Sequence, residues 1–92
     1  MRADSNPFDD RTLYTIDGVD GERTTITIDK LTADVLQMVL PDVHWWIQNA
    51  FNRVVEKRQS ATRREQGNLV RALANTEAQR HPQYRALIND IL

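Results

Sequence analysis

The stretch "TLYTIDGVDGERTTITID", residues 12–29, decides the fold of this chain. Two short segments rich in threonine, isoleucine and tyrosine flank a pair of Asp-Gly steps, and such steps supply the positive φ angles that a tight turn needs. We therefore predict a β-hairpin with strands near residues 12–16 and 23–28. An isolated two-stranded hairpin is only marginally stable, so its apolar face must pack on other elements.

The second predicted strand alternates strictly between two kinds of side chain. Arg23, Thr25 and Thr27 fall on one face because strand side chains alternate with period two, and the opposite face carries a threonine and two isoleucines. The apolar face belongs to the core. The polar row is either a solvated sheet face or a surface that contacts the groove of a nucleic acid.

Two helices are predicted directly after the hairpin. Asp29 is a suitable N-cap for the first, which must end at Leu40 because the residue before a proline disfavours the α conformation. Asp42 can cap the second. Its apolar residues recur at three- and four-residue spacing and predict the centre of the core: Val43, Ile47, Ala50, Phe51 and Val54.

Two further helices follow. Thr62 and Glu65 have the spacing of a capping box, which predicts a third helix running to about Ala78, and Pro82 suits the first turn of a fourth. The fold class is therefore α+β and mostly helical, with an N-terminal β-hairpin or ribbon followed by about four helices. We expect residues 1–10 to be a flexible acidic tail and residues 11–92 to form a single small domain.

Composition narrows the possible functions. The chain has 92 residues, no cysteine and a net charge of −1. A domain of this size buries only part of its surface, which favours a homodimer, and the absence of cysteine fits the cytoplasm. The sequence has neither an apolar run of the roughly 20 residues that span a bilayer nor a secretory signal at its beginning, so we expect no contact with a membrane.

Charge is distributed unevenly along the chain. Residues 1–29 contain seven acidic and three basic side chains, whereas residues 53–64 contain five basic and one acidic. This basic run is either an ordinary charged helix end or a patch that contacts phosphates. Its candidate phosphate contacts are Arg53, Lys57, Arg58, Arg63 and Arg64.

Enzyme chemistry is poorly supported by the sequence. His44 and His81 lie at the starts of different predicted helices and have no partner at metal-ligand or general-base spacing. We therefore predict no catalytic, metal or cofactor site. Trp46 borders the apolar stripe of its helix and is expected in the core, whereas Trp45 falls on the polar side, where a large aromatic side chain indicates a partner surface or a covered interface.

The order of strand, short helix, turn and longer helix over residues 23–57 resembles the ribbon-helix-helix family of dimeric DNA-binding proteins, and "RTTITI" resembles the ribbon of that family. The resemblance implies that Arg23, Thr25 and Thr27 read base edges in the major groove. It also implies that the backbone amides of Val43 and His44 hold a phosphate. Residues 62–92 would then be a helical extension.

Two functions follow as hypotheses. The first is a small homodimeric DNA-binding regulator or accessory protein of the repressor, antitoxin or plasmid partition and transfer type. The second is a non-enzymatic protein-interaction module with a hairpin packed on a helical bundle. The Asp-Gly turns allow the ribbon to pair within its own chain as well as between subunits, and the sequence leaves both pairings open.

Overall fold

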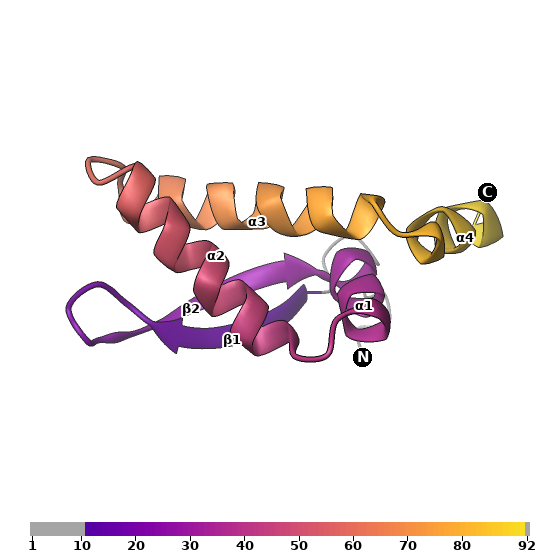
Figure 1. Cartoon of the computed structure of the whole chain (residues 1–92), viewed down its shortest axis with the longest axis horizontal. Coiled ribbons are helices and arrows are strands. Elements are labelled where there is room, and N and C mark those ends of the chain that lie inside the picture. The colour runs from indigo at the N-terminus through magenta and orange to yellow at the C-terminus, as the bar shows by residue number, and fades with distance from the viewer. Residues whose placement is uncertain (1–10, 92) are drawn as a thin grey trace, which may run out of the picture.

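The computed structural model describes residues 11–91 and consists of a β-hairpin followed by four helices (Figure 1). The predicted α+β class, mostly helical, is confirmed. The predicted acidic tail, residues 1–10, lies outside the described residues, as does Leu92. The elements are β1 (Arg11–Asp17), β2 (Arg23–Asp29), α1 (Lys30–Val39), α2 (Val43–Lys57), α3 (Arg63–Gln79) and α4 (Pro82–Ile91).

The two strands pair antiparallel within one chain, which is one of the two pairings that the sequence left open. In this register Thr15 lies opposite Thr25. The turn closes with a 2.6 Å hydrogen bond from the Gly18 amide to the Glu22 carbonyl oxygen, and Gly21 has a φ of 79°, a conformation that glycine adopts at little cost.

The predicted helix caps are all present. The side chains of Asp29 and Asp42 accept hydrogen bonds from the amides of Thr32 and Trp45, each at 3.0 Å. Leu40 ends α1 in an extended conformation, as expected before a proline. Residues 62 and 65 form both hydrogen bonds of the capping box at the start of α3.

The core is one cluster between the inner face of the hairpin and the helices. Helix α2 contacts β1 and α3 contacts β2, while α1 lies beside the end of the hairpin and α4 continues past the end of α3 (Figure 1). The predicted strand phase is correct, because Ile26 and Ile28 are buried while Arg23 and Thr25 are exposed. Of the stripe predicted on α2, all but the half-buried Val43 is buried.

Side chains of α2 cover the outer edge of β1. Gln48 pairs with the backbone of Asp17 through both ends of its amide: Oε1 accepts from the Asp17 amide at 2.8 Å, and Nε2 donates to the Asp17 carbonyl oxygen at 3.1 Å. His44 Nε2 donates to the carbonyl oxygen of Thr15. The α2 side chains thus take the place that a neighbouring strand would occupy.

Candidate nucleic-acid interface

A groove with a volume of about 460 Å³ runs between the outer edge of β2 and the first half of α3. Three arginines on α3 line it because Arg63 and Arg71 lie two helical turns apart on one face, with Arg64 beside them. Gly67 lies midway between Arg63 and Arg71 in sequence and has no side chain that could fill the groove. The full lining is Thr24, Thr25, Ile26, Phe51, Arg63, Arg64, Gly67 and Arg71, without a carboxylate.

Two of these arginines are tied to β2. Arg63 donates to the hydroxyl of Thr24, and Arg71 donates to the carbonyl and hydroxyl oxygens of Thr27, each at 3.4 Å. A guanidinium group has five N–H donors, so each arginine keeps donors for another acceptor. Arg64 is exposed, and no hydrogen bond or ion pair holds its side chain among the described residues. The groove is suited to an anion such as phosphate.

The outer face of the hairpin adjoins this groove through Thr25. On that face Asp17 lies directly across from Arg23, and Arg11 lies directly across from Asp29. The outward-facing side chains of the two strands therefore include two arginines and two aspartates, and their charges sum to zero. Any long-range attraction of this region for phosphates must come from the arginines of α3.

The structure divides the predicted site residues among three places. Thr25, Arg63 and Arg64 share the groove at β2, and the exposed Arg23 lies two residues from Thr25 on the same face. Thr27 is half-buried and bonded to an arginine of α3. Arg53, Lys57 and Arg58 line a different groove between α2 and α3.

Val43 and His44 form the third place, at the start of α2 next to β1. Val43 packs against the core, and the ring of His44 is bonded to the hairpin. The Asp42 carboxylate already accepts a hydrogen bond from the amide of Trp45 at this helix start. The phosphate contact that the family resemblance implies would therefore have to form beside a carboxylate.

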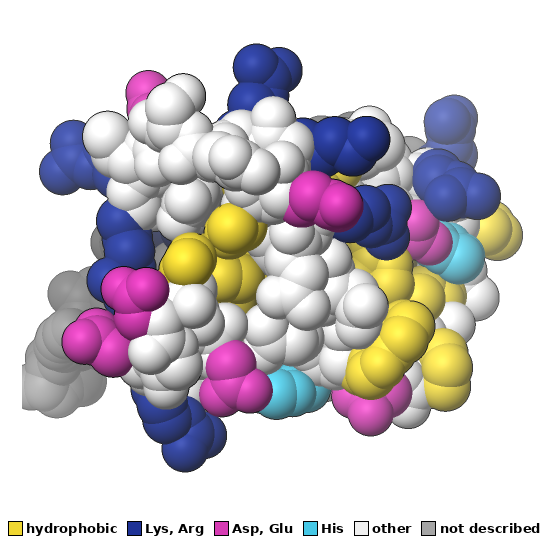
Figure 2. Space-filling view, turned by 60° about the vertical axis from the view of Figure 1, so that its left-hand side comes forward, with side chains coloured by type: hydrophobic (Ala, Val, Ile, Leu, Met, Phe, Trp, Pro, Cys, Tyr) yellow, Lys and Arg dark blue, Asp and Glu magenta, His cyan; other side chains and the backbone are white. Residues whose placement is uncertain are grey.

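Arg71 is the basic residue of the groove that the sequence predictions missed. It lies eight residues after Arg63, a spacing that places both on one helix face, and this spacing was the available signal. The basic run of residues 53–64 predicted only residues that are close neighbours in sequence. On the face that Figure 2 shows, Lys and Arg side chains lie in separate places and do not form one continuous patch.

The two tryptophans separate as predicted from their helix positions. Trp46 is partly buried and packs against the core, whereas Trp45 is 62% exposed. Trp45 belongs to α2 and does not line the groove at β2. A partner at Trp45 would therefore bind a surface separate from the arginines.

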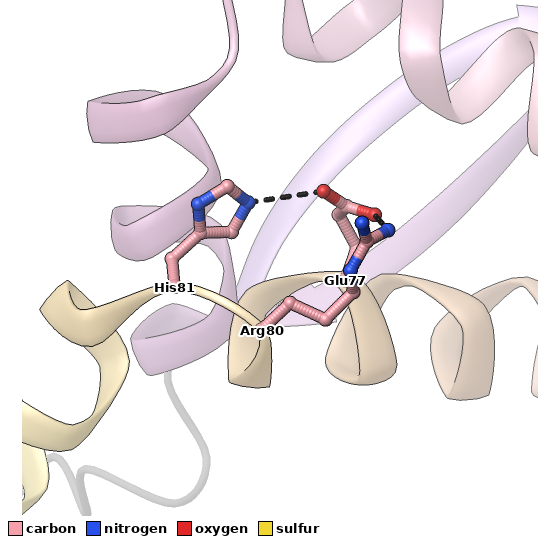
Figure 3. Close-up of polar contacts among 3 residues, drawn as sticks. All are labelled: Glu77, Arg80 and His81. Carbon is pink, nitrogen blue, oxygen red and sulfur yellow. Dashed lines mark hydrogen bonds and ion pairs between the residues drawn. The ribbon is translucent and has the colours of Figure 1, made fainter.

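A second polar cluster joins the end of α3 to the start of α4 (Figure 3). One carboxylate oxygen of Glu77 accepts a hydrogen bond from His81 Nε2 at 3.0 Å, and the other accepts from Arg80 at 3.0 Å. The hydrogen bond from His81, helped by the charges of Arg80 and His81, holds the pKa of Glu77 below its ordinary value despite partial burial. The cluster fixes the junction of two helices.

We expect replacement of Glu77 by glutamine to destabilise the protein at neutral pH and to have little effect in acid. The lowered pKa means that the folded state favours the ionised carboxylate, so its stabilisation is present above the ordinary glutamate pKa and is lost as pH falls through the folded value. Urea unfolding of both proteins across this pH range measures the difference. A destabilisation that does not change with pH would contradict an electrostatic origin.

Among residues 11–91, no group of three His, Cys, Asp or Glu side chains is placed to hold a metal ion. None of the helices in the same range is long and apolar enough to cross a bilayer. Comparisons with protein-family models, curated proteins and solved structures found no significant match.

Proposed function

We propose that this chain is a cytoplasmic DNA-binding regulator that holds the phosphate backbone with the arginines of α3 and presents the β-hairpin to the major groove. The observation that carries the proposal is the groove at β2, which Arg63, Arg64 and Arg71 line together with Thr25 and whose lining contains no carboxylate. Arginine binds phosphate through parallel N–H donors, and such contacts position a protein on a duplex.

The hairpin supplies the element that would read sequence. A two-stranded ribbon fits the major groove, arginine can pair with the acceptors of guanine, and threonine offers a hydroxyl and a methyl group to base edges. Arg23 and Thr25 are exposed on the outer face, and Thr25 also lines the arginine groove. The phosphate contacts and the base contacts of this proposal are therefore adjacent.

Fluorescence anisotropy with short duplexes at several salt concentrations tests the proposal. We expect affinity to fall linearly with salt on a double-logarithmic plot, and Arg64→Ala to weaken every duplex alike and reduce the slope by about 1. Arg23→Ala should instead weaken a site selected from random sequences by roughly 1–3 kcal/mol and leave random duplex nearly unchanged.

Arg85→Ala is the matched control, because it removes one exposed arginine from α4, away from the groove. We expect it to leave both affinity and salt slope close to those of the wild type. The absence of salt-sensitive binding at low ionic strength would overturn the proposal. Equal effects of Arg64→Ala and Arg85→Ala would show that binding depends on total charge and not on the groove.

A protein-interaction module is the second candidate function. Two observations favour it: the hairpin pairs within one chain and packs on the helices, and Trp45 is largely exposed. Aromatic side chains are enriched in protein interfaces, and binding through them depends little on salt. A partner whose affinity is insensitive to salt and is lost in Trp45→Ala would favour this function over DNA binding.

A further inference from the structure

Helix α3 has two stripes of mostly apolar side chains, and only one of them is covered. The inner stripe is buried against the rest of the domain and consists of Gly67, Val70, Ala74 and Ala78. The outer stripe consists of Leu69, Ala72, Leu73 and Thr76, whose spacing of three and four residues places them on one face. The two leucines of this stripe are 37% and 40% exposed.

The outer stripe borders a groove of about 330 Å³ between α3 and α2. Its floor also includes Val54, and Arg53 and Lys57 stand on the α2 side. No other element within residues 11–91 fills this groove. Exposed leucines at helical spacing are the arrangement by which one helix packs on another. The outer stripe is therefore called the seam below.

We propose that a second copy of this chain covers the seam, with the two α3 helices antiparallel about a two-fold axis. The stripe is symmetric about the point between Ala72 and Leu73. A two-fold axis through that point would place Ala72 opposite Leu73 of the second copy, and Leu69 opposite Thr76 of the second copy. A self-complementary surface of this kind is what a two-fold dimer requires.

Oppositely charged residues at the two ends of the stripe also suit an antiparallel pairing of two copies. Glu65 and Arg80 continue the same face beyond the two ends of the stripe, at equal distances in sequence from its centre. The antiparallel arrangement therefore places Glu65 of each copy near Arg80 of the other. Arg80 already binds Glu77, but its side chain is 71% exposed and retains N–H donors for a second carboxylate.

The size of the seam sets the expected strength of the dimer. Residues 65–80 span roughly 22 Å of helix at about 1.5 Å per residue. The interface would consist of one helix of this length from each copy, together with the α2 residues that border the groove. Its area is at the small end of specific interfaces, so we expect a dimer dissociation constant in the micromolar range. The seam lies on a different side of α3 from the arginine groove, and the inference does not depend on DNA binding.

Sedimentation velocity over a range of concentrations tests the proposal. The wild type should pass from monomer to dimer as concentration rises, and Leu73→Asp should remain monomeric because it places a charge at the centre of the seam. Met38→Asp is the matched control, since Met38 is 59% exposed on α1 and outside the seam. Circular dichroism of both variants checks that the fold is retained.

Glu65→Gln provides a milder test that keeps the helix start intact, because glutamine also serves in a capping box. Removing the carboxylate should raise the dimer dissociation constant severalfold. A wild type that stays monomeric at high concentration would overturn the proposal and leave the seam to a different partner. A dimer that survives Leu73→Asp, or that Met38→Asp abolishes equally, would place the interface on another surface and overturn it too.

Discussion

Replacement of Phe51 by alanine should destabilise the protein by roughly 3–5 kcal/mol, which is the usual cost of removing a buried phenylalanine side chain. Phe51 is 3% exposed and lies where α2, the inner face of the hairpin and the first half of α3 meet. Small domains have only about 5–15 kcal/mol of total stability, so the variant should be close to unfolding. Urea denaturation followed by circular dichroism measures the loss.

Trp45→Ala is the matched comparison, because it removes a larger aromatic side chain from the same helix at a position that is 62% exposed. Substitutions at such positions usually change stability by no more than about 0.5 kcal/mol. A loss as large as that of Phe51→Ala would mean that Trp45 is covered in solution. Such a result would contradict the exposed position described above.

Replacing Gly18 by alanine should destabilise the hairpin, whereas replacing Gly67 by alanine should not. A β-carbon at Gly18 would lie 2.8 Å from the carbonyl oxygen of Glu22, the atom that accepts the turn's closing hydrogen bond. The backbone must shift to relieve this contact, and overpacking of this kind typically costs about 1–3 kcal/mol. Thermal unfolding measures the change.

Gly67 provides the opposite case within the same chain. A β-carbon there would meet only the guanidinium group of Arg71, at an ordinary contact distance of 3.5 Å. Alanine is favoured over glycine inside a helix by roughly 0.5–1 kcal/mol, so Gly67→Ala should raise the unfolding temperature. If both variants were destabilised equally, the open space that the structure shows beside Gly67 would be contradicted.

The fold could be predicted because the helices and strands are indicated by sequence signals that lie within or next to each element. The alternation of "RTTITID" set the strand phase, Asp29 and Asp42 marked two helix starts, and the spacing of Thr62 and Glu65 marked a third. These signals depend on residues within one or two turns of each other. Periodicity and capping therefore sufficed for the elements and for the buried face of the hairpin.

The candidate site was less predictable because its residues meet only after the elements pack. Arg58 and Arg63 are near neighbours in sequence, but they line grooves in different places. Arg71 joins the β2 groove from outside the basic run. The role of His44 could not be predicted for the same reason. Its hydrogen bond to Thr15 joins residues 29 positions apart in sequence, and no local pattern indicates it.

The amide pairing between Gln48 and Asp17, two residues 31 positions apart in sequence, makes the hairpin depend on α2. Within residues 11–91 neither strand has a third strand beside it, and a two-stranded hairpin is only marginally stable without other elements packed on it. Local opening of α2 would free the β1 edge and expose the apolar face at the same time. The hairpin and α2 should therefore form one cooperative unfolding unit, with their amide protons protected from exchange to a similar degree.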